Sequence, residues 1–496
     1  MCLQYAVRII LQEERIDVMK AGKILVLAAA AAMCLGINSY AEEFYRGGDI
    51  TELSYIESLG GKYYDADGNN CDALDLLSEN GMNMARIRLT NTPGKGNGDG
   101  VYYLPAGFQD ENDCLSLAKR AKEHGMKIQF TFNYSDYWSN GSRQIIPSEW
   151  VKQIKDELGY DVRNADFLNK MTAEQRAEII DKLEKIVHDY TYDIMNKLKE
   201  QGTVPEYVSL GNEIRGGLLF PFANTYKANM NRERFELVFG EDKSDNDIIC
   251  PEDWESLARF INAGYEAVKE VSADTRVIIH LDDGSKVDKF TWYLDKLENA
   301  GAKYDVIGAS YYPAWSENTI ETCVDFCNEI TKKYDKDIMI MESGYNWNDT
   351  ISDGSAGQLV DIDAYKDVFP PTQEGHYGYM TALFEGLRSV EDNRCLGVLY
   401  WDPLMIHVDD GNGGSLSGWA YRESDDGVEK DIVENTTLFD FNGKAIKSIN
   451  AYREDKEKNT VGLIKPQYDE NGRLTDVKIE EADIRDAENN LYVRSK

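Results

Sequence analysis

Short apolar runs alternate with longer amphipathic stretches along most of the chain. Each run has the length and composition of a buried β-strand, because a few consecutive large apolar residues end at polar or small ones. Eight runs are predicted to be strands: Phe44–Ile50, Met82–Leu89, Lys127–Phe132, Tyr207–Gly211, Arg276–Leu281, Tyr304–Tyr311, Ile338–Met341 and Leu396–Trp401.

Between these runs the apolar residues recur with helical spacing, as in residues 112–125, 171–202 and 253–271. Eight strands that alternate with helices predict an α/β fold, the (β/α)8 TIM barrel. An open doubly wound sheet is the alternative. That fold would favour a G-x-G-x-x-G turn after the first strand, and the segment YRGGDITELSYIE at 45–57 contains none.

The connections that follow the strands are long and rich in Gly, Asp, Asn and aromatic residues, for example 90–107 and 401–427. The returns into the next strand are short, as in 123–127 and 299–305. A barrel enzyme carries its active site on the loops at the C-terminal face of its strands. The pattern therefore predicts elaborated loops and a functional site at that face.

The N-terminus has the features of an export signal. Residues 19–41 hold two lysines, an apolar stretch and the small-x-small pattern Ser39-Tyr40-Ala41, which together predict a secretory signal peptide. Residues 1–18 are interpreted as translated sequence upstream of the true start at Met19. Cleavage after Ala41 predicts an exported protein, periplasmic or extracellular, and Cys34 leaves open a cell-surface lipoprotein. No later apolar run is long enough for a transmembrane span.

The mature chain is expected to consist of a catalytic domain, residues 42–452, and a small charged appendage, residues 453–496, in which Asn471-Gly472 predicts a hairpin turn. The full sequence carries a net charge of −34, which argues against nucleic acid and anionic membranes as partners. A neutral polymer is compatible with such a surface. Six of the eight cysteines follow residue 41, and none forms a C-x-x-C pair, so no zinc site is predicted. Their number permits disulfides without giving a pairing.

Two glutamates lie where predicted strands end. Glu213 follows the fourth strand in EYVSLGNEIRGG, and Glu342 follows the seventh in DIMIMESGYNW. Strands four and seven lie nearly opposite each other around a barrel, so we expect the two carboxyl groups to face one another. One protonated and one ionised carboxyl group is the minimum equipment for cleaving a glycosidic bond. The alternative is that one or both form ion pairs at the rim.

Other polar residues end neighbouring strands. Arg86 is expected to keep Glu342 ionised, although Arg88 alternates onto the same face and is hard to distinguish from it. Asn212 offers an amide to a sugar hydroxyl or is a simple turn residue. Tyr312 is favoured over its neighbour Tyr311 as a hydrogen-bond donor to Glu342.

His280 is interpreted as a subsite residue rather than a base, with a satisfied core histidine as the equal alternative. Of the eight tryptophans, five fall in loops after strands, where flat rings can stack on sugars: Trp138, Trp315, Trp347, Trp401 and Trp419.

The motifs GNEIRGGLLFP, IGASYYPAW, YSDYW, TQEGH, LYWDP and NTTLFDFNGKAIKSI together resemble the arabinogalactan endo-β-1,4-galactanases of glycoside hydrolase family 53, from about residue 47 to residue 452. The resemblance implies a retaining barrel enzyme with Glu213 as acid/base and Glu342 as nucleophile. It places Arg86, Asn212 and Tyr312 around the scissile bond and Trp401 under the sugar. Asp136 in YSDYW and the loop residues Trp138, Trp315 and Trp347 are expected to line further subsites.

The chain departs from the family pattern at three positions: Asn133 stands where His is common, Thr90 where Trp is common, and Asp402 where Glu is usual. Some bacterial relatives tie the last two loops with calcium, for which residues 407–414 are a weak candidate; no cofactor is expected to be required. The resemblance implies β-1,4-galactan as substrate and galacto-oligosaccharides as products. A monomer is expected, although the sequence does not give the oligomeric state. A related retaining mannanase or xylanase, and a non-catalytic glycan-binding protein, are the alternatives.

Overall fold

The computed structural model describes residues 44–94, 105–136, 139–141, 144–230, 248–316, 318–360, 362, 365, 367–409, 411, 415, 432–453, 460–468 and 474–483. The predicted upstream extension and signal peptide therefore lie outside the described residues, as do Trp138, Trp419 and the Asn471-Gly472 turn. The domain boundaries, the site of cleavage and lipidation at Cys34 stay predictions.

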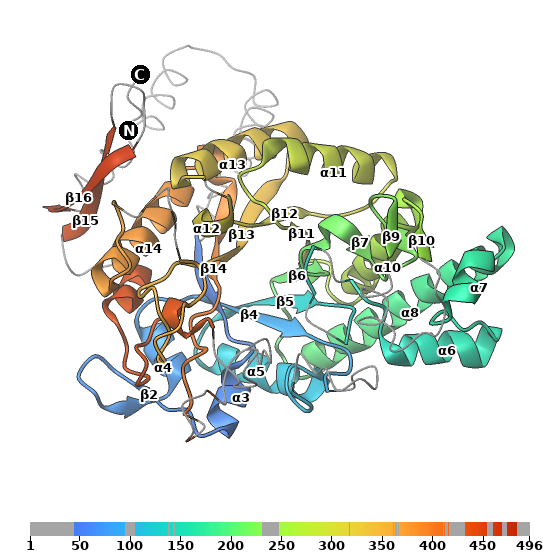
Figure 1. The fold of residues 1–496 in the computed structure, drawn as a ribbon, viewed down its shortest axis with the longest axis horizontal. Coiled ribbons are helices and arrows are strands. Elements are labelled where there is room, and N and C mark those ends of the chain that lie inside the picture. The colour runs from blue at the N-terminus through green and yellow to red at the C-terminus, as the bar shows by residue number, and fades with distance from the viewer. Residues whose placement is uncertain are drawn as a thin grey trace, which may run out of the picture. The chain divides into compact units, whose positions relative to one another are not determined.

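Eight parallel strands close into a barrel in the spatial order β1-β14-β13-β12-β11-β6-β5-β4 (Figure 1). The predicted TIM barrel is confirmed, and the bounds of each predicted strand agree with those of an observed strand within two residues. The barrel strands are β1 (Tyr45–Asp49), β4 (Met84–Leu89), β5 (Lys127–Phe132), β6 (Tyr207–Leu210), β11 (Arg276–Leu281), β12 (Val306–Ser310), β13 (Asp337–Ser343) and β14 (Cys395–Tyr400).

Helices connect the strands and cover the outside of the barrel (Figure 1). Residues 112–125, 171–202 and 253–271 were predicted as helices and are confirmed as α5, α8 and α10. The helices are α3 (Leu53–Ser58), α4 (Ala73–Glu79), α5 (Glu111–Glu123), α6 (Ser148–Leu158), α7 (Ala165–Lys170), α8 (Ala173–Glu200), α10 (Trp254–Val271), α11 (Val287–Asn299), α12 (Pro313–Ser316), α13 (Ile320–Tyr334) and α14 (Gln373–Arg388).

Capping residues set where these helices begin. The Thr172 side chain accepts a hydrogen bond from the Gln175 N–H, and the Gln175 side chain accepts one from the Thr172 N–H, so α8 starts with a complete capping box. Asp110 and Asp253 cap α5 and α10 in the same position.

Smaller elements lie in the connections. They are the strands β2 (Tyr63–Tyr64), β3 (Asn70–Cys71), β7 (Gly217–Leu218), β8 (Ala223–Asn224), β9 (Ala228–Met230), β10 (Ile248–Cys250), β15 (Thr460–Tyr468) and β16 (Leu474–Asp483), and the 3-10 turns η1 (Ile214–Gly216), η2 (Glu391–Asn393), η3 (Glu434–Thr436) and η4 (Lys447–Tyr452). In the C-terminal appendage β15 and β16 pair antiparallel on either side of the predicted turn.

Each barrel strand has two different faces. The outward side chains join the helices in one large apolar cluster, which includes Ile87, Phe130 and Ile340. A smaller cluster fills the bottom of the barrel interior and consists of Tyr45, Met84, Tyr207, Ile278, Val306, Met339, Met341, Leu396 and Leu399. Above it the inward positions turn polar, so the apolar layer forms the floor of the site.

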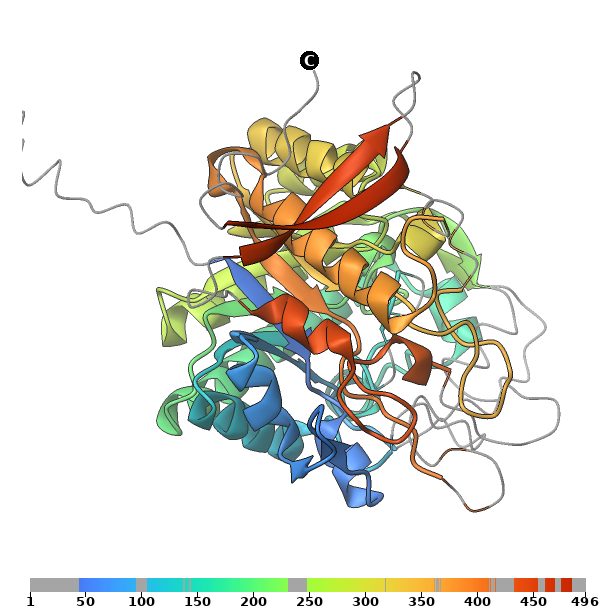
Figure 2. The same cartoon turned by 90° about the vertical axis from the view of Figure 1, so that its left-hand side faces the viewer.

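The loops that follow β13 and β14 lie side by side (Figure 2). The Trp347 N–H donates to the Asn435 carbonyl at 2.9 Å, and the Gln358 N–H donates to the Ile432 carbonyl at 2.8 Å. Of the calcium candidate 407–414, Asp410 and residues 412–414 are outside the described residues, and calcium binding stays a prediction. The six cysteines after residue 41 carry free thiols. Among the described helices, none is long and apolar enough to cross a membrane.

Candidate active site

Glu213 and Glu342 meet at the mouth of the barrel. Carboxylate oxygens of the two residues and a ring nitrogen of His280 all lie within 4.8 Å of one another. The residues come from the ends of β6, β13 and β11 and are far apart in the sequence. The structure thus brings together the two carboxyl groups that the sequence placed at the ends of strands four and seven.

A bulge turns Glu342 into the barrel. Along β13 the side chains of Ile338 and Ile340 pack outward and those of Met339 and Met341 pack inward, so strict alternation would send Glu342 outward. The pairing of β12 with β13 shifts at this point and sets Glu342 opposite Ser310. The extra residue re-aims the side chain, as bulges beside active sites commonly do.

Two donors bind the carboxyl group of Glu342. The Arg86 Nη1 donates to its Oε1 at 2.7 Å, and the Tyr312 hydroxyl donates to its Oε2 at 3.1 Å. Glu342 is only 5% exposed, so the guanidinium charge acts on it with little screening. The neighbouring Tyr311 instead donates to the Asn318 carbonyl at 2.8 Å, which distinguishes the two tyrosines.

Arg86 also positions Asn212. Its Nη2 donates to the Asn212 Oδ1 at 2.5 Å, and its Nη1 reaches the Asp49 Oδ2 at 3.2 Å. Arg88, the other candidate on this face, pairs with Asp49 at 2.7 Å and Glu52 at 2.6 Å instead. Arg86 is therefore the arginine that reaches Glu342.

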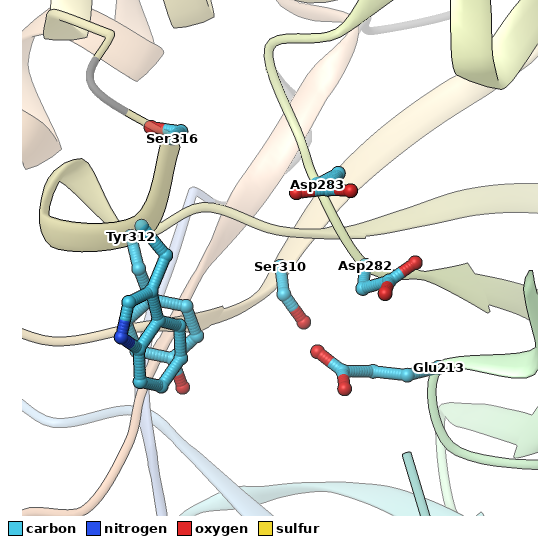
Figure 3. A pocket seen from close by; sticks show the side chains of 7 residues that line it. Glu213, Asp282, Asp283, Ser310, Tyr312 and Ser316 are labelled. Atoms are coloured by element: carbon cyan, nitrogen blue, oxygen red, sulfur yellow. The ribbon is translucent and has the colours of Figure 1, made fainter. Parts of the chain in front are cut away.

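Glu213 has the opposite environment. Burial, then the nearby Glu342 charge and then Asp282 raise the pKa of Glu213 well above its usual value. A hydrogen bond from Ser310 and the Arg86 charge act in the other direction without cancelling the effect. Figure 3 shows the Ser310 hydroxyl and the Glu213 carboxyl group pointing toward each other. Glu213 is thus suited to carry a proton and Glu342 to stay ionised.

His280 is fully buried and neutral, because burial and Arg86 hold its pKa well below the usual value. The Glu213 backbone N–H donates to its Nδ1 at 3.4 Å, so the proton is on Nε2, which donates to the Ser310 Oγ at 2.8 Å. The Ser310 hydroxyl is then free to donate to Glu213. His280 therefore orients Ser310, and whether it also contacts a substrate stays a prediction.

Beside Glu213 lies a cavity of about 140 Å³, lined by Glu213, Asp282, Asp283, Ser310, Tyr312, Trp315 and Ser316 (Figure 3). Trp315 is 56% exposed, and its ring lies 4.5 Å from that of Tyr312. An exposed indole at the edge of a polar cavity offers a stacking face to a sugar.

The other predicted contacts are more buried. Trp401 is 3% exposed, with its ring 6.4 Å from that of Tyr312 in an edge-to-face arrangement. Trp347 is 6% exposed and packs against Phe441. Asp136 accepts hydrogen bonds from Thr92 and from the Ser148 N–H, so it links the loop after β4 to α6. Substrate contacts by these side chains stay predictions.

Several residues of the site were not identified from the sequence: Asp49, Glu52, Gln144, Asp282 and Ser310. Asp49 and Ser310 end barrel strands just as the two glutamates do, so the same strand-end rule could have found them. Gln144 lies in the long loop after β5, and its amide donates to the Asn212 carbonyl at 2.7 Å. No sequence pattern indicates that contact.

The two departures at Thr90 and Asn133 touch each other. The Asn133 Nδ2 donates to the Thr90 Oγ1 at 3.1 Å, at the ends of adjacent strands β5 and β4. Both side chains are buried. The two side chains therefore form one contact at this rim of the barrel.

Comparison with known proteins gives a consistent result. The family described as "Glycosyl hydrolase family 53" matches residues 45–180 and 171–452. The chain is 28% identical over 390 residues to an arabinogalactan endo-β-1,4-galactanase of Cellvibrio japonicus, covering 77% of this chain and 87% of the relative. It is 24% identical over 431 residues to an endo-β-1,4-galactanase of Bacillus subtilis, covering 83% and 86%.

Among solved structures, the family 53 catalytic domain of Ignisphaera aggregans is similar with a TM-score of 0.63 and 27% identity, over 84% of this chain and 97% of that one. The family match extends over most of the chain and includes every barrel strand. The protein belongs to glycosyl hydrolase family 53 and is a glycoside hydrolase.

Proposed function

We propose that this protein is a retaining endo-β-1,4-galactanase that cleaves the galactan side chains of type I arabinogalactan and pectin and releases galacto-oligosaccharides. The named relatives act on this class of polysaccharide. The galactan chain itself is neutral, and a neutral polymer is compatible with a net charge of −34.

One observation carries the mechanism: two carboxyl groups within 4.8 Å of each other have opposite environments. Retaining glycosidases hold their carboxyl groups about 5–5.5 Å apart, whereas inverting enzymes need about 6.5–9.5 Å to admit a water molecule. The short separation supports double displacement.

In the first step the ionised Glu342 attacks the anomeric carbon of the galactosyl unit while Glu213 gives its proton to the leaving oxygen. The C–O bond breaks, and a galactosyl ester forms on Glu342. Glu213, now ionised, then takes a proton from water, whose oxygen attacks the same carbon and releases Glu342. Tyr312 and Arg86 bind the two carboxylate oxygens of Glu342 and orient it for attack.

The test is a comparison of products and variants. Wild-type protein is expected to release reducing ends from purified β-1,4-galactan but not from mannan or xylan, with the β-anomer first in proton NMR. Glu342→Gln should lose turnover by a factor of at least about 10⁴ and remain folded. Cleavage of mannan or xylan instead would indicate the related activities, and binding without cleavage would indicate a glycan-binding protein.

Export is a further proposal, supported by the signal-like sequence 19–41. Protein recovered from the producing organism should begin at Glu42 if the segment is cleaved there. An N-terminus at Cys34 carrying a lipid would instead favour a surface lipoprotein.

A further inference from the structure

Behind Glu342 the barrel contains a cluster of charged side chains, of which the proposed mechanism uses only Arg86. Three further carboxyl groups and two guanidinium groups lie there, all at most 5% exposed. They are Asp49 at 0%, Glu52 at 5%, Asp402 at 0%, Arg86 at 0% and Arg88 at 1%. Such a cluster is stable only when its charges and hydrogen bonds are balanced.

Asp49 is the centre of this cluster. It accepts from the Arg86 Nη1 at 3.2 Å and from the Arg88 Nε at 2.7 Å, and Thr51 satisfies its other oxygen. Since the same Nη1 of Arg86 donates to Glu342, Asp49 and Glu342 draw on one guanidinium group. A change of charge near Asp49 therefore also changes the electrostatic environment of Glu342.

Glu52 and Asp402 each have one satisfied and one unsatisfied oxygen. The Glu52 Oε1 accepts from Arg88 at 2.6 Å and from Gln109 at 3.0 Å, and the Asp402 Oδ1 accepts from the Leu404 N–H at 3.0 Å. Within the part of the chain that the structure describes, no donor reaches the buried Glu52 Oε2 or Asp402 Oδ2.

The carboxyl groups of Glu52 and Asp402 lie within hydrogen-bond reach of each other. Two buried carboxylate oxygens cannot share such a contact unless one of them carries a proton. Burial, and then the Glu52 and Asp49 charges, raise the pKa of Asp402 well above its usual value. Burial also raises the pKa of Glu52, which keeps the charged partner Arg88.

We propose that Asp402 and Glu52 share one proton, which is carried on Asp402. We further propose that the single negative charge of this pair influences the ionisation of Glu342. With that proton in place, Asp49 and the pair contribute two negative charges against the two guanidinium groups. The excess negative charge of the site is then the carboxylate of Glu342 alone. Formation of the galactosyl ester removes that charge and leaves the buried cluster neutral.

The position of Asp402 connects this pair to the substrate side of the site. Asp402 directly follows Trp401, whose ring lies against Tyr312, and Tyr312 donates to Glu342. Asp402 and Glu52 do not touch the reacting atoms and are positioning residues. Their role in catalysis rests on the proposed function of Glu342, whereas the shared proton does not.

The proton itself is tested by difference infrared spectroscopy at neutral pH. Glu213→Gln serves as the parent, because it removes the C=O stretching band of the protonated Glu213. The parent is expected to keep a carboxylic acid band that disappears on adding either Asp402→Asn or Glu52→Gln, since an amide at either position lets the remaining carboxylate ionise. A parent without the band, or a band that survives both substitutions, overturns the proposal. This readout requires no turnover, so it stands even if Glu342→Gln shows that the proposed mechanism is wrong.

The effect on Glu342 is tested by the acid limb of the kcat/KM profile. The pair has a single negative charge. When Asp402→Asn or Glu52→Gln replaces one member, the other member ionises and the net charge stays the same. Each single variant should therefore leave the pH of the acid limb unchanged. The double variant removes that charge, and the acid limb should move about one unit to lower pH because the ionised Glu342 is then favoured. A single variant that moves the limb as far as the double one, or a double variant that leaves it unmoved, contradicts the proposal.

Discussion

The neighbours of each catalytic glutamate determine its charge state. Glu342 has a guanidinium group and a phenol on its two oxygens, which favour the carboxylate. Glu213 faces Glu342 and Asp282 in a half-buried position, which favours the protonated acid. In the proposed mechanism the same type of side chain thus acts as a nucleophile at one position and as a proton donor at the other.

The Ser310 hydroxyl influences the pH at which activity is lost on the alkaline side of the profile. Its hydrogen bond stabilises the ionised form of Glu213 and lowers the pKa of that acid. Ser310→Ala removes the bond, so the pKa rises and Glu213 keeps its proton to higher pH. The alkaline limb of kcat/KM should therefore move up by about one unit, as expected for one charge-assisted hydrogen bond.

Ser316→Ala is the matched control, since Ser316 lines the same cavity and accepts a hydrogen bond from the Asn318 N–H instead. It should leave the alkaline limb where it is. A Ser310→Ala limb that stays in place or moves to lower pH would show that Ser310 does not donate to Glu213.

Arg86 cannot be replaced by another cation. Its fork reaches Glu342, Asp49 and Asn212 at once, and the single ammonium group of a lysine cannot reproduce that geometry. Arg86→Lys is expected to lower kcat by about 10²–10³-fold with little change in KM, because the orientation of Glu342 matters in the transition state. Arg120→Lys, at a surface ion pair, is the control. A larger effect on KM than on kcat would indicate a role in ground-state binding.

At the scale of the element, the turn after β6 explains why glycines follow Glu213. Glu213 lies in the left-handed region with φ +50°, and Gly217, at the end of η1, has φ +109°. A Cβ on Gly217 would lie 1.9 Å from the Ala223 carbonyl oxygen, so β7 and β8 could not pair as they do. Gly217 thus lets the chain fold back closely enough to hold the acid in place.

Gly217→Ala is therefore expected to lower the free energy of unfolding by about 3 kcal/mol or more and to reduce kcat, because the collision adds to the strain of a positive φ. Gly202→Ala is the comparison: Gly202 has φ +80°, and a Cβ there meets nothing within 4 Å. It should cost only about 1 kcal/mol and leave kcat unchanged. Equal losses in urea unfolding would mean that φ alone, not the close approach, requires glycine at 217.

The strands and loops show which parts of the fold can be predicted from the sequence. Apolar runs such as 127–132 and 276–281 are predictable because buried strands leave a local signature, and both match β5 and β11 to the residue. The inward direction of Glu342 is not predictable from the sequence, because strict alternation along the strand would point it outward. It depends on a bulge in the pairing of β12 with β13. The contact of Gln144 with Asn212 depends on the path of a long loop, so local patterns do not contain it.

For the whole molecule, the half-buried acid of the proposed mechanism, Glu213, is a cost to stability that grows with pH. The pKa of Glu213 is raised in the folded state, so its contribution to stability is fully present below the ordinary pKa of a glutamate, 4.5. It is lost as pH rises toward the folded pKa, because the unfolded chain releases the proton first. Glu213→Gln stays neutral at every pH and escapes this loss.

The variant should therefore match the wild type in thermal unfolding near pH 4 and become more stable than it toward pH 8. The gain in free energy is about 1.4 kcal/mol for each unit by which the folded pKa exceeds the ordinary value. Glu200→Gln, on the exposed end of α8, removes a carboxyl group without burial and should show no such pH-dependent gain. If Glu213→Gln were no more stable than the wild type at pH 8, the acid would not be held protonated by its surroundings, and the division of labour between the two glutamates would need another cause.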